Sequence, residues 1–198
     1  GDATAAAMLG DLIATGPASM APAGEGPDRY GRRHAWLFAG GHSVQETLLT
    51  AGLARARWYP GETDCFAAFV AAERPAREGH RGLWAAPAYA VRAADDPSLR
   101  GQNGLYAVVE GKVVSVGHGS RMTFLDFGPA YRRDFTVMLA PAIAGKLAVG
   151  GIAGGAAGAD AFANRAVRVR GVIEESGGPA IRLKDPAEIE LIDTGDER

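Results

Sequence analysis

The two halves of the chain carry different patterns of hydrophobic and polar positions. In the first half, apolar residues recur with helical spacing in three stretches. These are residues 3–14, the residues after Ser43, and a longer stretch that begins at Thr63 or Asp64. Short strands are predicted at residues 19–23 and 33–39. The first half should therefore combine helices with a small sheet.

Local signals define the ends of these predicted helices. Ser43 is expected to cap the second helix, with Glu46 as its capping-box partner, and Gly52 to end it in a left-handed conformation. Pro75 lies inside the third helix and should bend it, because proline lacks a backbone donor and crowds the preceding turn.

The second half is rich in Val, Ile and Phe and predicts strands. The five strand-like segments are residues 105–116, 122–127, 134–139, 166–174 and 180–183. A helical or loose stretch over residues 142–164 separates the third segment from the fourth. This order is that of a five-stranded OB barrel, and Gly111 is expected to bend its first strand. Together with the Thr123–Gly128 strand, the order is similar to OB-fold nucleic-acid-binding modules.

Charge and cysteine content narrow the function classes. Lys and Arg number 21 against 23 Asp and Glu, a formal charge of -2, so no basic field gathers nucleic acid from a distance. Recognition of phosphate must then be local. Cys65 is the single cysteine, which excludes an internal disulfide, and its place beside Phe66 and Phe69 predicts a small buried hydrophobe.

The cellular context stays open at this point. No membrane-spanning segment is predicted, and the pattern is compatible with a periplasmic or secreted protein or with a cytoplasmic one. The oligomeric state is not predicted. The chain begins Gly-Asp-Ala-Thr rather than with Met, so we expect it to be trimmed or incomplete.

The strongest candidate for chemistry is the turn Asp28-Arg29-Tyr30-Gly31-Arg32, which precedes the apolar strand Ala35–Ala39. The turn directs two guanidinium groups and one phenol toward a common point. Arg matches phosphate oxygens in a planar, bidentate way and stays charged at any working pH, which favours a phosphate-bearing ligand. The alternative is a solvated Asp-Arg surface pair, worth roughly 0–1 kcal/mol.

Further segments extend this motif into a family resemblance. With Val44–Leu49, Ala51–Ala56 and Arg81–Trp84, the turn resembles the thermonuclease (staphylococcal-nuclease-like) family over residues 1–86. The resemblance implies a calcium-dependent phosphodiesterase, in which carboxylates hold the metal, a glutamate activates water and two arginines stabilise charge on phosphorus. Arg32 matches one of those arginines. The segment expected to supply the other arginine and the metal carboxylates lies upstream of Gly1.

The resemblance also implies nucleotide-binding residues. Arg29 and Tyr30 match positions that contact a terminal phosphate, and Trp58 and Tyr59 fall where family aromatics lie against a base. Stacking of a base on such rings is worth roughly 1–3 kcal/mol. Trp58 and Tyr59 fit equally well as residues that cover the end of a small core.

A second candidate surface lies in the second half. Alternation places Thr123, Leu125 and Phe127 inward and Phe124 outward. Phe124 is expected to form an aromatic and basic patch with its neighbours Arg121, Tyr131, Arg132 and Arg133. The alternatives are a polar connection over residues 131–133 or a barrel that binds protein. The histidines at 34, 42, 80 and 118 lack metal-ligand spacing and are interpreted as surface or strand residues.

These patterns together predict an α+β, mainly β-barrel protein. Residues 1–86 form a partial thermonuclease-type OB barrel with three helices, residues 87–104 a linker, and residues 105–194 a second five-stranded OB-like barrel. The predicted function is hydrolysis of DNA or RNA, single strands favoured, with an accessory OB domain. We expect this chain alone to be inactive and to bind no calcium. The alternative is a non-catalytic adaptor, built from two OB-type units, for nucleic acid or protein.

Overall fold

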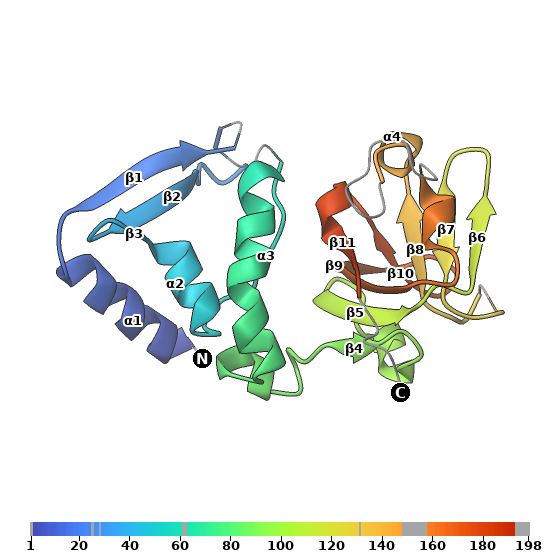
Figure 1. Ribbon diagram of the computed structural model, residues 1–198, viewed down its shortest axis with the longest axis horizontal. Helices are drawn as coiled ribbons and strands as arrows, with labels where there is room; N and C mark the ends of the chain where they lie inside the picture. The colour runs from blue at the N-terminus through green and yellow to red at the C-terminus, as the bar shows by residue number, and fades with distance from the viewer. Residues whose placement is uncertain are drawn as a thin grey trace. The chain divides into compact units, whose positions relative to one another are not determined.

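The computed structural model describes residues 2–24, 26–27, 29–60, 63–130, 132–147 and 158–192, and of residues 2, 63 and 64 only the backbone. Asp28, Tyr131 and the predicted cap at Thr63 or Asp64 therefore lie outside the described part. The chain divides into two compact units, residues 1–90 and 91–198 (Figure 1).

The first unit combines a small antiparallel sheet with helices, as its sequence predicts. Its elements are α1 (Asp2–Ala14), β1 (Ala18–Ala23), β2 (His34–Ala39), β3 (His42–Ser43), α2 (Val44–Thr50), α3 (Thr63–Glu78) and the 3-10 helix η1 (Gly82–Ala85). The strands are ordered β1-β2-β3. Ser43 caps α2, because its hydroxyl accepts a hydrogen bond from the Glu46 N–H at 3.3 Å, which confirms the predicted cap.

Gln45, near the start of α2, supports β2 through its side chain. Its amide nitrogen donates to the Ala35 carbonyl at 3.0 Å, and its amide oxygen accepts from the Leu37 N–H at 3.2 Å. The side chain thus takes the place of a neighbouring strand, satisfying backbone groups on the edge of β2 that the short strand β3 does not reach.

Helix α3 buries one face and continues through Pro75 to Glu78. Phe66 and Val70 are buried on that face at helical spacing. The prediction for Cys65 is wrong, because the residue is exposed. Its position beside Phe66 in the sequence turns it about 100° away from the buried face.

The second unit is built around one large sheet. Its elements are β4 (Arg92–Ala93), the 3-10 helix η2 (Pro97–Gly101), β5 (Tyr106–Lys112), β6 (Ser115–His118), β7 (Thr123–Asp126), β8 (Thr136–Leu139), α4 (Pro141–Ala144), the 3-10 helix η3 (Ala159–Phe162), β9 (Ala166–Glu175), β10 (Pro179–Arg182), the 3-10 helix η4 (Pro186–Glu188) and β11 (Ile189–Leu191). The strand order is β4-β5-β9-β10-β8-β7-β6, and β11 also pairs with β9. Of these pairs, β10–β8 and β4–β5 run parallel.

The first predicted strand is split into β5 and β6, which are separated only by Val113 and Val114. The Val113 N–H donates to the Arg165 carbonyl at 2.9 Å, whereas the Val114 N–H donates to the Asp126 carbonyl at 2.7 Å. The chain therefore leaves the β9 side and joins the β7 side between two consecutive residues. One continuous segment of chain therefore supplies both β5, the second strand in the sheet order, and β6, the last.

Gly111, the residue predicted to bend the first strand, lies two residues before this change of partner. It pairs regularly with Val167 inside β5. A Cβ atom at Gly111 would lie 2.6 Å from the Cβ of Ala94 and 2.9 Å from the Phe127 ring. The residue is small because a neighbouring segment and an aromatic ring approach the strand closely.

The core of the second unit lies on one side of the strands, with Leu125, Val137 and Ile181 fully buried. The predicted linker contributes to it. Leu99 in η2 is fully buried in this core, and β4 pairs with β5. Residues 91–104 thus belong to the second unit.

The α+β class predicted from the sequence is confirmed. Within the described ranges neither the sheet of the first unit nor that of the second closes into a complete hydrogen-bonded ring of strands. In the first unit three strands are too few to enclose a barrel. In the second, the ladder is interrupted where the chain changes partners at Val113 and Val114.

Candidate functional site

The turn between β1 and β2 brings the predicted phosphate-binding side chains together. The guanidinium carbon of Arg29 lies 4.7 Å from the centre of the Tyr30 ring, and that of Arg32 lies 5.1 Å from it. Tyr30 is 66% exposed. Gly31 has a φ of 77°, so the turn uses the left-handed conformation that glycine adopts without a steric penalty. Two cations and one phenol thus share a solvent-facing surface.

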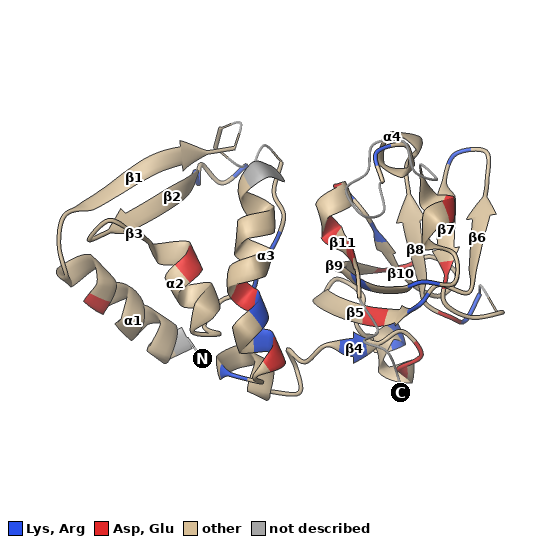
Figure 2. Ribbon diagram, viewed as in Figure 1, with Lys and Arg blue, Asp and Glu red and all other residues tan. Residues whose placement is uncertain are grey.

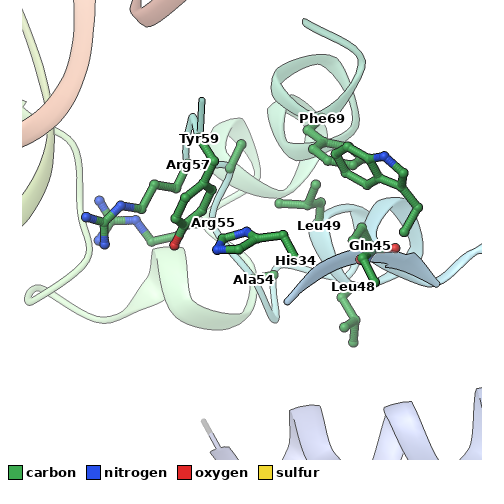
Figure 3. A pocket seen from close by; sticks show the side chains of 12 residues that line it. His34, Gln45, Leu48, Leu49, Ala54, Arg55, Arg57, Tyr59 and Phe69 are labelled. Atoms are coloured by element: carbon green, nitrogen blue, oxygen red, sulfur yellow. The ribbon is translucent and has the colours of Figure 1, made fainter. Parts of the chain in front are cut away.

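A pocket of about 350 Å³ lies in the first unit beside β2, the strand that follows this turn. Its walls come from β2, α2, α3 and the segment between the two helices (Figure 3). The lining residues are His34, Ala35, Trp36, Gln45, Leu48, Leu49, Ala54, Arg55, Ala56, Arg57, Tyr59 and Phe69. Of the predicted site residues, Tyr59 alone is in this lining.

Aromatic and cationic side chains order the pocket. The rings of His34 and Tyr59 lie 4.2 Å apart at 58°, and Figure 3 shows them side by side. Arg57 lies against Tyr59, with its guanidinium carbon 5.6 Å from the centre of the Tyr59 ring. Trp36 and Phe69 form a second pair at 5.1 Å. The pocket is therefore suited to a flat, apolar or aromatic group with a polar end near Arg57.

The structure separates the two predicted base-stacking residues. Tyr59 faces the pocket, whereas Trp58 is half-buried outside its lining. His34 was not among the predicted site residues, because a histidine at the start of a strand gives no signal until its partner Tyr59 is known. Another histidine, His118, is exposed as predicted, and its Nε2 lies 2.8 Å from Asp160 Oδ1.

Behind the pocket, α3 carries a buried ion pair. Glu73 is fully buried and Arg77 is 3% exposed, and the Arg77 guanidinium donates to Glu73 Oε1 at 3.0 Å. The Ala56 N–H donates to the second carboxylate oxygen of Glu73 at 2.7 Å. Figure 2 shows acidic and basic segments close together on this helix. The pair fixes the segment from Ala54 to Tyr59 against α3 and so positions one wall of the pocket.

The donor groups that the structure describes around the turn do not fit calcium. Calcium takes six to eight oxygen ligands, mostly carboxylates and carbonyls, whereas Arg29 and Arg32 place positive charge on this surface. In the described part of the chain no three His, Cys, Asp or Glu residues are grouped so as to hold a metal ion. The carboxylate of Glu73 is already engaged by Arg77 and by the backbone.

In the second unit, the predicted patch around Phe124 is arranged differently from the expectation. Phe124 pairs with Gly117 on one side and with Met138 on the other, on the face of β7 opposite the buried Leu125. Arg121 precedes β7, whereas Arg132 and Arg133 follow it. The three arginines thus lie at opposite ends of the strand and do not form one cluster around the ring.

Arg133 belongs to a separate hollow of about 290 Å³ at the far end of β7. Its backbone carbonyl accepts from Arg100, and the neighbouring Asp134 carboxylate accepts from the Ala130 N–H at 2.8 Å. A Cβ atom at Gly128 would lie 2.2 Å from that carboxylate, so the loop requires glycine there. Arg132 and Arg133 are therefore carried by a structured loop.

Arg182 on β10 lies in the same cross-strand row as Phe124, two strands away, with Met138 on β8 between them. It pairs with Met138 in the ladder, and its guanidinium contacts the sulfur atoms of Met122 at 3.7 Å and Met138 at 4.0 Å. Its Nε donates to Glu174 at 3.3 Å. Arg182 was not among the predicted site residues, because only the parallel pairing of β10 with β8 places it on the same sheet face as Phe124.

Comparison with known proteins identifies the first unit. Residues 3–86 match the family model described as staphylococcal nuclease homologue. The first unit is therefore a thermonuclease-like domain with an OB-like α+β fold, which confirms the resemblance seen in the sequence. A domain of this family indicates a nuclease-type function with nucleic acid as the substrate in general.

The match ends before the second unit begins. Comparison of the chain with curated proteins gives no match. Among the described helices, none has the length and apolar character needed to cross a membrane.

Proposed function

We propose that the first unit is a nucleic-acid phosphodiester hydrolase domain in which Arg32 stabilises negative charge on the phosphorus centre. The observation that supports this is the pair of guanidinium groups of Arg29 and Arg32, both within about 5 Å of the Tyr30 ring, on an exposed turn of a thermonuclease-like domain. Arg stabilises developing phosphate charge because its planar fork donates two parallel hydrogen bonds.

The two arginines have different proposed roles. Arg32 contacts the phosphate that reacts, and Arg29 with the Tyr30 hydroxyl binds a terminal phosphate of the same nucleotide. The ring between them offsets part of the repulsion of the two cations through cation–π contact. Tyr59, fixed by His34 and Arg57, provides a stacking surface for the base, and Trp58 either adds to it or covers the end of the core.

Calcium, when bound in the complete family site, supplies a positive centre that polarises the phosphate and the attacking water. The described residues around the turn do not fit it, so no step of the reaction is assigned to a metal here. We therefore propose that this chain by itself cleaves DNA or RNA negligibly.

The second unit is proposed to be an accessory OB-type module over residues 105–194 that binds single-stranded nucleic acid. The order β6-β7-β8-β10-β9-β5, with a parallel pair between β8 and β10, supports the OB assignment. Phe124, half-buried on the outer face of β7, supports the ligand surface. Arg121 is proposed to contact phosphate at one end of this surface, and Arg132 and Arg133 at the other.

A second candidate function is a non-catalytic adaptor built from the two units, which binds nucleic acid or protein. The cationic donor set around Tyr30, which recognises phosphate without a metal, favours it. Incubation of the chain with single-stranded DNA and calcium, with and without a chelator, tests whether this chain by itself is non-catalytic. Binding without cleavage is expected for this chain, whereas cleavage that the chelator abolishes would show that it completes a catalytic site.

A further inference from the structure

Arg182 is held on the outer face of the second unit's sheet by three contacts. Its Nε donates to Glu174 on the adjacent strand β9, and its two terminal nitrogens contact the thioethers of Met122 and Met138. Met138 is buried, whereas the side chain of Arg182 is 44% exposed. The guanidinium plane is thus fixed on one side while part of it stays open to solvent.

The ion pair with Glu174 changes what Arg182 offers a ligand. The carboxylate, itself 41% exposed, offsets the charge of the guanidinium at 3.3 Å. A phosphate approaching Arg182 would meet Glu174 as well, so the pair is a poor phosphate site. The delocalised guanidinium plane remains a good stacking surface, because guanidinium stacks on planar rings and is weakly hydrated.

Arg182 and Phe124 lie in one row across the sheet. The row runs Gly117, Phe124, Met138, Arg182 over β6, β7, β8 and β10. Strands are spaced about 4.8 Å apart, so Phe124 and Arg182, two strands apart, are separated by about 10 Å. Gly117 leaves the space beside Phe124 open, since a Cβ atom there would lie 3.9 Å from the Cβ of Phe124.

We propose that Arg182 is a base-stacking residue, so that this face receives two bases of a single strand, one on Phe124 and one on the guanidinium of Arg182. This inference rests on the proposed binding of single-stranded nucleic acid to the second unit. Phe124 and Arg182 contribute stacking that is nearly independent of salt, because the charge of Arg182 is offset by Glu174. Arg121, Arg132 and Arg133 contribute the salt-dependent contacts with phosphate.

The test uses fluorescence anisotropy of the full chain with two labelled oligonucleotides at two salt concentrations. One is an oligothymidylate, and the other has the same length but consists of abasic sites, so it keeps the phosphates and lacks the bases. Arg182→Lys keeps the charge and removes the planar surface. It should weaken binding of oligothymidylate by about five-fold or more, as expected for one stacked base, and leave binding of the abasic strand unchanged.

Two further variants complete the test. Glu174→Gln exposes the charge of Arg182 and should steepen the salt dependence by about 0.7 in the logarithmic slope, the value for one single-strand phosphate. Arg165→Lys, an exposed arginine elsewhere in the second unit, is the matched control and should bind like the wild type. Circular dichroism melting of each variant checks that the fold is kept.

The outcomes separate this inference from the function on which it rests. If the wild type binds neither strand at low salt, the proposed nucleic-acid function of this unit is wrong. If the wild type binds oligothymidylate and Phe124→Ala weakens it while Arg182→Lys has no effect, that function stands and the role of Arg182 is overturned. Equal losses of Arg182→Lys on both strands would show a phosphate contact, which also overturns it. If Arg182→Lys melts early, Arg182→Gln takes its place, and stacking is measured by the quenching of 2-aminopurine in a bound strand. Weaker quenching than in the wild type would support the role of Arg182, and equal quenching would overturn it.

Discussion

The carbonyl oxygen of Gly52 accepts a hydrogen bond from the backbone N–H of Leu83 at 2.8 Å. This bond joins the end of α2 to η1, which follows α3. Gly52 and Gly82 both have left-handed backbones, with φ of 73° and 58°. A Cβ atom on either would collide with the backbone of the other segment, at 2.5 Å from the Arg81 carbonyl or 2.3 Å from the Gly52 carbonyl. The two helix ends meet backbone to backbone.

Gly82→Ala is expected to destabilise the first unit by about 2–5 kcal/mol, as the sum of a left-handed alanine and an overpacked contact. Tryptophan fluorescence during urea unfolding measures this, because all three tryptophans, at 36, 58 and 84, lie in the first unit. Gly41→Ala is the matched control. Its φ is 83° with no atom within 4 Å of the added Cβ, so only the conformational cost applies. Equal effects of the two substitutions would contradict the close approach.

Replacing one member of the buried Glu73–Arg77 pair should cost more than replacing both. Glu73→Leu leaves the Arg77 guanidinium buried without its carboxylate, which costs about 3–5 kcal/mol. The double variant Glu73→Leu with Arg77→Met removes that charge, although the Ala56 N–H still loses its acceptor. The same fluorescence-detected unfolding measures both. A double variant as unstable as the single one would show that the stabilising contribution of Glu73 is mainly its bond to Ala56.

Arg32→Ala is expected to lower kcat by roughly two or more orders of magnitude in a catalytically active form of the protein, because a preorganised donor to the transition state is lost. Arg29→Ala, which removes the contact with the terminal phosphate, should mainly raise KM. Steady-state hydrolysis of single-stranded DNA distinguishes them. A near-normal kcat with a raised KM for Arg32→Ala would assign Arg32 to substrate binding alone.

The buried carboxyl of Glu188 makes the stability of the second unit depend on pH. Burial raises its pKa above the usual range, even though the backbone N–H groups of Lys184 and Asp185 donate to it. A raised pKa in the folded state means that the stabilising contribution is fully present below the unfolded-state pKa and is lost as pH rises through the folded-state pKa. In Glu188→Gln the side-chain amide oxygen is an uncharged hydrogen-bond acceptor at every pH.

The stability difference between Glu188→Gln and the wild type should therefore shift in favour of the variant as pH rises through the raised pKa, and then level off. Far-UV circular dichroism during urea unfolding from pH 4 to 7 measures it. All three tryptophans lie in the first unit. An unfolding transition that circular dichroism shows and tryptophan fluorescence does not show therefore belongs to the second unit. A difference that does not change with pH, or that changes in the opposite direction, would contradict the burial argument.

The local patterns of the sequence predicted most of the elements. Helical spacing, the Ser43 cap and the left-handed Gly52 were sufficient for α1, α2 and α3, because these depend on residues close together in the chain. Alternation placed Leu125 inward and Phe124 outward for the same reason. The short strands β4 and β11 were missed, because two or three residues give no detectable period and gain their structure from pairing with β5 and β9.

The candidate site was predictable only where its residues are neighbours in the sequence. Arg29, Tyr30 and Arg32 share one turn, so their grouping followed from the motif. His34 and Tyr59 come into contact, and Phe124 and Arg182 come into one row of the sheet, only through tertiary pairing, which the spacing of these residues in the sequence does not reveal. The patch of Arg121, Arg132 and Arg133 was predicted as one cluster because sequence proximity does not reveal that β7 separates them.

The pairing of β5 with β9 has a consequence for how the chain is made. Lys112 lies opposite Ala166, whereas in the first unit Ala23 lies opposite His34 across a short connection. Contacts between residues distant in sequence form slowly, because the intervening loop must close first. During synthesis, β5 has no partner in β9 until Ala166–Glu175 has left the ribosome, by which time the whole first unit has been made. The first unit should therefore reach its native structure while β5 still exposes an unpaired strand edge, which makes the interval before β9 emerges the one most open to misassembly.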